Sequence, residues 1–360
     1  MMEFLLIGIA LFLSFGNGAN DNFKGFATVW GSETLSYRDA LLLATVATVA
    51  GSLASVFLAE GLVQQFSGKG LLPDVIVSAP NFILSVGIGA ALTVMIATRF
   101  GLPISTTHAL IGGLVGAGLA SNAGEIQFTK LWNTFMLPLL FSPIAAAMLG
   151  FIAYRLLRLR STTKDCACVL APESAFVPES GIAILHVGAP RLMIAEDEAC
   201  DKLEQPAARF SIAGVLDRFH IVSAGLICFA RGVNDTPKLA ALLIAAHLVD
   251  AHLSIVLIAI VMALGGLMFA RRVAETMSQR VTRMEHTQGV AANLITAALV
   301  LSASKFGLPV STTHVSVGSI AGVGAGAHSL NWSTLRNILW SWVATLPMAA
   351  GIAWIVLKVL

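Results

Sequence analysis

The sequence predicts an all-α integral membrane protein of two inverted repeats, each with a broken helix, further spanning helices and a re-entrant helical hairpin. The first observation behind this prediction is composition. Of the 360 residues, 56% are hydrophobic and 12% are charged, whereas about a quarter of the residues in a soluble domain are charged. The second observation is that two polar stretches each occur twice, in the same order, and the third is that every copy interrupts an apolar run.

The first repeated stretch joins an Asn-Asp pair to a lysine three residues further on. It reads FGNGANDNFKG over residues 15–25 and FARGVNDTPKL over residues 229–239. A shift of 214 positions aligns the copies and places Phe15, Gly18, Asn20, Asp21 and Lys24 on Phe229, Gly232, Asn234, Asp235 and Lys238. A charge inside an apolar segment must find a partner or water. Two copies in register therefore predict a functional site, and helix capping at a membrane interface is the alternative.

The second repeated stretch reads GLPISTTH over residues 101–108 and GLPVSTTH over residues 307–314, at a shift of 206 positions. Such a stretch cannot cross hydrocarbon as a regular helix that faces lipid, so its backbone must be buried in protein or line a cavity. An apolar segment precedes each copy and a glycine-rich segment follows it. We therefore interpret each copy as the tip of a re-entrant hairpin.

The elements follow one order in both repeats, and each crossing needs about 20 apolar residues. The first repeat, 1–157, is predicted to hold a broken span over 3–30 interrupted near 16–22, a second span over 40–59, a hairpin over 82–120 and a last span over 131–157. The second repeat, 216–360, is predicted to hold a broken span over 219–249, a span over 253–270, a hairpin over 290–327 and a last span over 335–356. Residues 158–215 form a polar loop between the repeats.

The number of crossings predicts how the repeats are oriented. Three crossings per repeat is an odd number, so the second repeat is inverted, both termini lie on one side and the 158–215 loop lies on the other. Outside the spans, the terminal side carries only Lys69, Lys130 and Lys358, whereas the loop side carries most of the arginines. By the positive-inside rule, the loop is predicted to be cytoplasmic and both termini to lie outside the inner (plasma) membrane.

Several function classes do not fit this pattern. A net charge of +2 without a basic stripe argues against a nucleic-acid partner. An enzyme is not predicted, because Ser105 and His108 lie on one hairpin tip without a third orienting group. Cys166-x-Cys168 is too weak a signal for a metal site, and no cofactor is predicted. An anion channel also uses re-entrant loops, but inverted repeats with interrupted helices favour a secondary transporter in the lipid bilayer.

The repeated stretches resemble those of a known family. Gly18-Ala-Asn-Asp21, its copy Gly232-Val-Asn-Asp235 and the two Ser-Thr-Thr-His tips are similar to the PiT family of inorganic phosphate transporters. The resemblance covers both repeats and leaves out residues 158–215. It implies symport of phosphate with Na⁺ or H⁺, while some members are associated with sulfate or with metal-complexed phosphate. A homodimer is left open.

The resemblance also implies which residues form the site for substrate and coupling ion. These are Asn20, Asp21, Asn234 and Asp235 with the tip hydroxyls of Ser105, Thr106, Thr107, Ser311, Thr312 and Thr313. The physics agrees, because hairpin tips and broken helices expose unpaired N–H groups at the positive end of a helix dipole, which suits an anion. The two carboxylates cannot favour an anion directly, so we expect them to hold a coupling cation or to carry a proton.

Lys24 and Lys238 depart from the family pattern, which commonly has a second asparagine at these positions. An ammonium group there could neutralise the neighbouring aspartate in place of Na⁺, or donate to the anion. Either role favours proton coupling, and it leaves sulfate open as a different substrate. The alternative is that both lysines snorkel to the membrane surface. Arg231 stands where the first repeat has Asn17, so it distinguishes the two half-sites.

Overall fold

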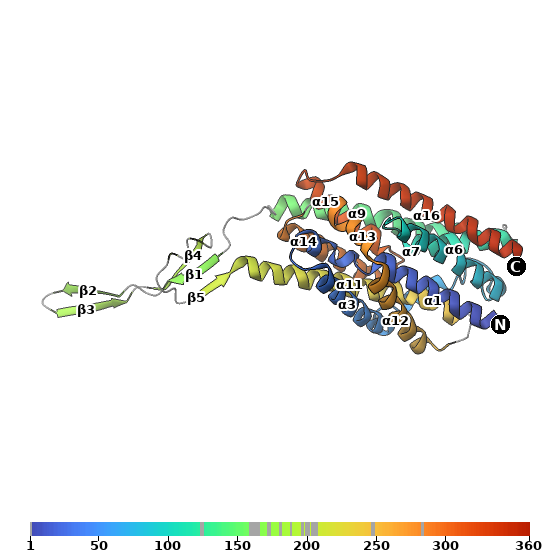
Figure 1. Ribbon diagram of the computed structural model, residues 1–360, viewed down its shortest axis with the longest axis horizontal. Helices are drawn as coiled ribbons and strands as arrows, with labels where there is room; N and C mark the ends of the chain where they lie inside the picture. Colours follow the sequence, from blue (N-terminus) through green and yellow to red (C-terminus); the bar gives the residue numbers. More distant parts are fainter. Residues whose placement is uncertain are drawn as a thin grey trace. The chain divides into compact units, whose positions relative to one another are not determined.

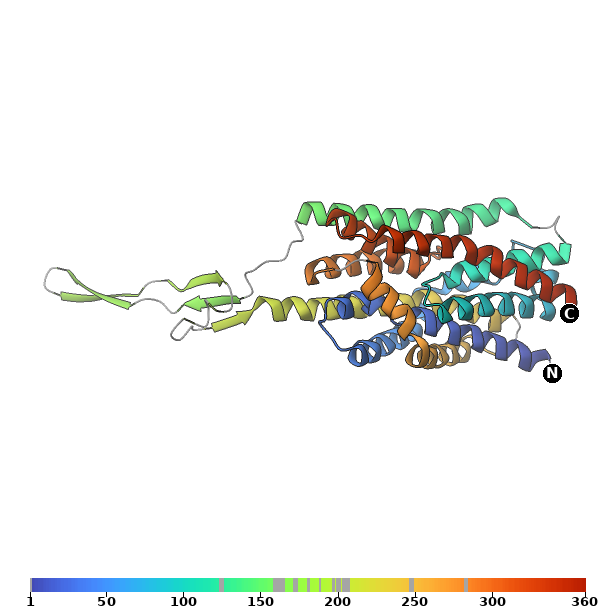
Figure 2. The ribbon, with the colours of Figure 1, turned by 45° about the horizontal axis from the view of Figure 1, so that its top comes forward.

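The computed structural model describes residues 2–122, 126–157, 166–170, 174–179, 182–187, 189–195, 198, 202, 208–245, 249–281 and 284–360. The chain divides into a helical unit, Met1–Leu159 with Ile221–Leu360, and a second unit, Arg160–His220. Within the helical unit the long helices run side by side, and both chain termini lie at the same end (Figures 1 and 2).

The helices carry both repeated stretches. Their bounds are α1 (Met2–Asp21), α2 (Ala27–Gly31), α3 (Tyr37–Leu58), α4 (Glu60–Phe66), α5 (Asp74–Val77), α6 (Pro80–Arg99), α7 (Thr106–Asn122), α8 (Phe128–Lys130), α9 (Leu137–Leu157), α11 (Ile212–Ala245), α12 (Ala251–Phe269), α13 (Arg271–Glu275), α14 (His286–Lys305), α15 (Thr312–Gly326) and α16 (Trp332–Val359). Shorter helical turns are η1 (Lys24–Phe26), η3 (Leu131–Met136) and η4 (Thr276–Arg280).

Seven helical segments among the described residues are long and apolar enough to cross a membrane. Five of them match predicted crossings, and the other two are α6 and α14, the first arms of the predicted hairpins. The sixth predicted crossing, α11, is not among the seven and carries the second Asn-Asp-Lys stretch. Large apolar side chains such as Phe57, Phe141 and Trp340 are exposed on the outer helices. The chain is therefore a multi-pass membrane protein whose apolar surface suits a lipid environment.

The two predicted broken spans differ from each other. In the first, α1 ends at Asp21 and α2 begins at Ala27, so the break follows the Asn-Asp pair, later than the predicted 16–22. In the second, α11 runs unbroken through residues 229–239, and the prediction of a broken helix there is wrong. Gly25, a poor helix former, follows the first lysine, whereas Leu239 follows the second. Helix α11 continues even though Pro237 lies inside it.

Both GLP stretches lie where one helix ends and the next begins, and residues 101–108 and 307–314 are called the tips; that these are re-entrant hairpins stays a prediction. The first joins α6 to α7 and the second joins α14 to α15. Gly101 and Gly307 have φ values of 68° and 65°, in the left-handed region that favours glycine. The amide of Leu102 donates to the Ala97 carbonyl at 2.9 Å, and the corresponding amide in the second copy repeats this bond. The helix before each tip therefore ends with the same C-terminal capping hydrogen bond.

Glycines allow the two signature helices, α1 and α11, which carry the Asn-Asp pairs, to pack closely on a helix of the other repeat. A Cβ atom at Gly18 or Gly265 would collide with backbone where α1 crosses α12. A Cβ at Gly51 or Gly232 would collide where α11 crosses α3. The two crossings use corresponding positions, at the shift of 214. Small residues at such crossings are how membrane helices come into close contact.

We expect Gly51→Ala and Gly265→Ala each to lower the thermal unfolding temperature of the detergent-solubilised protein, because overpacking two backbones costs about 1–3 kcal/mol. The matched control is Gly225→Ala on α11, where a Cβ meets no atom within 4 Å and where alanine favours the helix. Equal unfolding temperatures for Gly51→Ala and Gly225→Ala would show that the crossing tolerates a wider helix separation.

The second unit corrects the prediction of an all-α chain with a polar 158–215 loop. Strand β1 (Cys166–Leu170) pairs antiparallel with β4 (Arg191–Ala195) and with β5 (Ala208–Ser211), in the order β4-β1-β5. Strands β2 (Ser174–Glu179) and β3 (Ile182–Val187) form an antiparallel hairpin. Short runs of β-branched and apolar residues form these strands, and the polar composition of the whole segment conceals such runs.

The cysteines of this unit form no described metal site. Cys166 and Cys168 are buried and their Sγ atoms lie 3.4 Å apart. Among the described residues no group of three or more His, Cys, Asp or Glu side chains could hold a metal ion. Cys200 lies outside the described residues.

Candidate functional site

Five charged side chains meet in the interior where the four repeated stretches converge. Within the part of the chain that the structure describes, they are the only buried Asp, Glu, Lys or Arg residues, and each is at most 4% exposed. They are Lys24, Lys238, Arg231, Asp21 and Asp235. Three cations and two carboxylates leave a formal excess of one positive charge. This cluster is buried in the protein interior.

Lys24 connects the first signature helix to both tips. Its Nζ contacts Asp21 Oδ1 and donates to Asn20 Oδ1 at 2.8 Å. It also donates to the Ile104 carbonyl at 3.0 Å, in the first tip, and to Thr313 Oγ1 at 2.6 Å, in the second. The ammonium group is therefore surrounded by oxygen atoms from both repeats, which offsets the loss of its hydration.

Lys238 makes the corresponding contacts in the other half. Its Nζ lies 3.5 Å from Asp235 Oδ1 and donates to the Val310 carbonyl at 2.7 Å and to Thr107 Oγ1 at 2.9 Å. A shift of 206 relates Val310 to Ile104 and Thr313 to Thr107, so both lysines bind their own tip and the opposite one. Neither lysine reaches the surface, and the snorkelling alternative is wrong for this structure.

The asparagines hold each tip against its signature helix. Asn20 donates to Thr98 Oγ1 at 2.9 Å and to the Leu102 carbonyl at 3.0 Å, and its Oδ1 accepts from the Ile104 amide at 3.2 Å. Asn234 accepts from Ser304 Oγ at 3.1 Å and donates to the Val310 carbonyl at 3.4 Å and to Asp235 Oδ1 at 2.9 Å. Both amides thus position the tips in the present conformation.

Asn17 and Arg231 connect the two halves of the cluster, which are Asp21 with Lys24 and Asp235 with Lys238. Asn17 Nδ2 donates to Asp21 Oδ2 at 3.0 Å and to Asp235 Oδ2 at 3.4 Å. The Arg231 guanidinium lies 3.6 Å from Asp235 Oδ2 and donates to Asn17 Oδ1 at 3.4 Å. Sequence analysis singled out Arg231 as an asymmetry but missed the role of Asn17. The available signal was its spacing, since Asn17 lies one helical turn before Asp21.

The predicted tip hydroxyls divide into two groups. Ser105 and Ser311 accept from the amides of the tip histidines at 3.1 and 3.2 Å, so they cap the helices that follow. The threonines face the charged cluster: Thr106 Oγ1 donates to Asp21 Oδ2 at 3.2 Å, and Thr107 and Thr313 donate to carbonyls of the opposite tip at 3.3 and 2.8 Å. Thr312 is buried beside them.

The tip histidines lie outside the charged cluster. The rings of His108 and His314 are 4.5 Å apart between centroids, and His314 stacks on Trp342 at 3.8 Å. All three residues line an apolar cavity of about 690 Å³ that also involves Pro143 and Pro347, from α9 and α16. Their surroundings support a packing role in this conformation.

The arrangement is suited to binding a small anion. Helices α7 and α15 both begin at the cluster, at Thr106 and Thr312, so the positive ends of two helix dipoles meet there. The surplus positive charge adds to this field. The carboxylates are held by hydrogen-bond donors and ammonium groups, which favour their charged form.

Comparison with known proteins agrees with this geometry. A model of the phosphate transporter family matches residues 17–353. A protein of Pyrococcus abyssi with the name "putative phosphate permease" is 28% identical over 99% of this chain and 96% of its own length. A low-affinity inorganic phosphate transporter of Bacillus subtilis, named as probable, is 26% identical over 100% of this chain and 98% of its own.

A solved structure shows the same fold. It is titled a sodium-dependent phosphate transporter, superposes with a TM-score of 0.78, and covers 99% of this chain and 98% of its own at 23% identity. The family model spans nearly the whole chain, including three of the four repeated stretches in full and the first from Asn17 onward. This chain therefore belongs to the phosphate transporter family.

Proposed function

We propose that this protein imports inorganic phosphate by cation symport, with alternating access to the buried cluster. The observation that carries the proposal is the surplus positive charge at the meeting point of two helix N-termini. An anion would offset that charge and accept hydrogen bonds from the threonine hydroxyls once the present contacts rearrange. Because the charged residues also hold both tips together, binding and movement of the tips would be coupled.

Two inverted repeats with re-entrant hairpins are the architecture that we propose for this movement. Support comes from the lysine contacts. Each lysine binds a carbonyl of its own tip and a threonine hydroxyl of the opposite tip, and these partners are at corresponding positions in the two repeats. A two-fold related arrangement of this kind allows two conformations of similar energy, one open to each side. Between these two conformations, such a cycle passes through a state in which the site is closed to both sides, and the buried cluster fits that state.

The coupling cation in this proposal is a proton. Sodium needs several oxygen ligands that are free to turn towards it, but the oxygens of Asp21 already accept from Lys24, Asn17 and Thr106. Asp235 is likewise in contact with Lys238 and Arg231. A proton needs no such space, and a protonated carboxyl group keeps a hydrogen bond to a neighbouring oxygen.

The test is uptake of labelled phosphate and sulfate into proteoliposomes under separately imposed Na⁺ and H⁺ gradients. We expect saturable phosphate uptake that follows the H⁺ gradient and that sulfate does not match. Uptake that depends on Na⁺ alone would overturn proton coupling, and preferred sulfate uptake would overturn the substrate. Passive, non-saturating flux would favour a channel.

The proposed topology predicts which cysteines an impermeant thiol reagent can reach. Cys166 and Cys168 are buried and cannot report sidedness, so we choose Lys202→Cys at an exposed position. In intact cells this variant should react no more than the unmodified chain, and it should react after permeabilisation, because the segment would be cytoplasmic. Strong labelling of intact cells would reverse the proposed orientation.

A further inference from the structure

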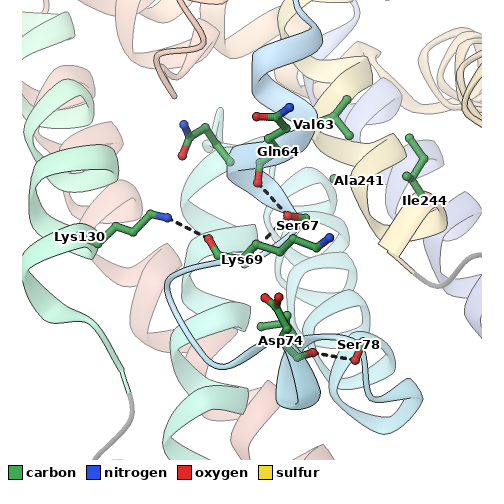
Figure 3. A pocket seen from close by; sticks show the side chains of 11 residues that line it. Val63, Gln64, Ser67, Lys69, Asp74, Ser78, Lys130, Ala241 and Ile244 are labelled. Atoms are coloured by element: carbon green, nitrogen blue, oxygen red, sulfur yellow. Dashed lines mark hydrogen bonds between the residues drawn. The ribbon is translucent and has the colours of Figure 1, made fainter.

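A cavity of about 730 Å³ opens in the helical unit beside the charged cluster. It is lined by the end of α4, by the turn after it, by α5, by Lys130 of α8 and by the last turns of α11. Figure 3 shows the side chains of Lys69, Asp74 and Lys130 around it, with Ala241 and Ile244 on the α11 side. Two ammonium groups and one carboxylate give this cavity a formal surplus of one positive charge.

The inner end of the cavity lies close to Lys238. Ala241, in the lining, follows Lys238 by three residues, about one turn of α11. Phe66 lies between the lining residues Gln65 and Ser67, and its ring is 5.6 Å from the Lys238 ammonium group. Phe66 is 3% exposed and packs edge-on against Phe135. Its ring therefore lies next to the charged cluster, while its two neighbours in the chain line the cavity.

The turn that carries Lys69 is held in place. Lys130 Nζ donates to the Lys69 carbonyl at 2.9 Å, and a Cβ at Gly70 would collide with that ammonium group. Gly70 itself has a φ of 73°, a conformation that favours glycine. Lys69 is exposed at the cavity and Lys130 is partly buried. The Lys130 ammonium group is thus fixed against the turn, and the turn fixes the point from which the Lys69 side chain extends.

The corresponding position in the other half is closed. At the shift of 214, Ala241 corresponds to Ala27, and Ala27 lines a pocket of only about 10 Å³. Met277 and Met284 also line that pocket. Of these two related positions, one is open and the other is filled by side chains. Figure 2 shows that the helix over residues 128–157, which begins beside the open cavity, starts at the end of the helical unit where both termini lie.

We propose that this cavity is the outer vestibule of the transport pathway, where Lys69 and Lys130 collect the anion before the Phe66 ring moves and admits it to Lys238. The inference rests on the proposed function and adds the place of first capture. The bound anion here is held by solvent-exposed charge, so capture depends on ionic strength, unlike binding at the buried cluster.

The first test is Lys69→Gln, with Lys358→Gln as the matched control. Both remove one exposed ammonium group from the terminal side, but Lys358 does not line the cavity. We expect Lys69→Gln to raise the KM for phosphate by roughly threefold or more at low ionic strength, with an unchanged maximal rate, and to approach the unmodified KM at high salt. Lys358→Gln should leave the KM unchanged. Equal KM values for the two variants would overturn the vestibule.

The second test places a chosen charge at the cavity. Ser78→Cys, at an exposed lining position, is treated in intact cells with a negatively charged or a positively charged thiol reagent, and the unmodified chain is treated in parallel. The negative adduct should raise the KM for phosphate and the positive adduct should not. Equal effects of the two reagents, or none, would overturn the vestibule while phosphate uptake stands. Absence of phosphate uptake by the unmodified chain would overturn the proposed function as well.

Discussion

Replacing Asp21 or Asp235 by asparagine is expected to abolish coupled phosphate uptake while the protein stays folded. Asparagine keeps the size of the side chain and can still hydrogen-bond, but it removes one of only two negative charges from a buried cluster that holds three positive ones. Leaving a buried charge without its partner costs about 3–5 kcal/mol. This is a cost in folding stability, whereas uptake is lost because the variant no longer has a carboxylate to carry the coupling proton at that position.

The measurement is initial uptake into proteoliposomes, normalised to the protein that elutes as a single folded species in detergent. Asp250→Asn serves as the matched control. That aspartate is exposed and caps α12 by accepting from two backbone amides, a role that asparagine also fills. If either buried variant transported at the unmodified rate with the same ion dependence, its carboxylate would have a structural role only.

The two aspartates are not equivalent, and the difference has a physical origin. Asp21 is balanced by Lys24 and by hydroxyl donors, whereas Asp235 lies between Lys238 and Arg231. Removing the second carboxylate leaves two cations facing each other, so Asp235→Asn should also be the less stable variant. The exchange of Asn17 for Arg231 between the two copies places the extra cation beside Asp235.

The sequence alone was sufficient to predict the central arrangement. Two shifts, 214 and 206, identified every charged residue of the buried cluster except Arg231, which the mismatch with Asn17 singled out. They also identified both glycine-containing turns, because a charge in an apolar run and a GLP turn each have few structural solutions. Membership of the phosphate transporter family agrees with these motifs.

Other features of the structure could not be predicted by aligning the two repeats. Helix α11 continues through Pro237 and Lys238, whereas alignment with the stretch around Lys24 suggested a break. The strands of the second unit are short and lie in a segment of polar average composition. Asn17 reaches both carboxylates because α1 and α11 pack with a particular register, and that register is seen only in the folded structure.

The double variant Lys24→Asn with Lys238→Asn is expected to change the coupling ion. Both lysines contact the carboxylate three residues before them and both are buried. Removing them changes the formal charge of the cluster from +1 to −1 and leaves two carboxylates facing oxygen atoms of the tips. Such a site, lined by carboxylate, carbonyl and hydroxyl oxygens, suits a hard cation such as Na⁺.

We therefore expect the double variant to lose phosphate uptake by roughly a hundredfold when sodium is absent, and to regain part of it when a Na⁺ gradient is imposed. The unmodified protein should respond to the H⁺ gradient under both conditions. Lys358→Asn, an exposed change of the same chemistry, controls for the loss of positive charge in general. Robust sodium-driven uptake by the unmodified protein, undiminished in the double variant, would mean that the lysines do not replace a coupling ion. Sodium would then bind at another place in the unmodified protein, because the two lysine ammonium groups occupy the space beside Asp21 and Asp235.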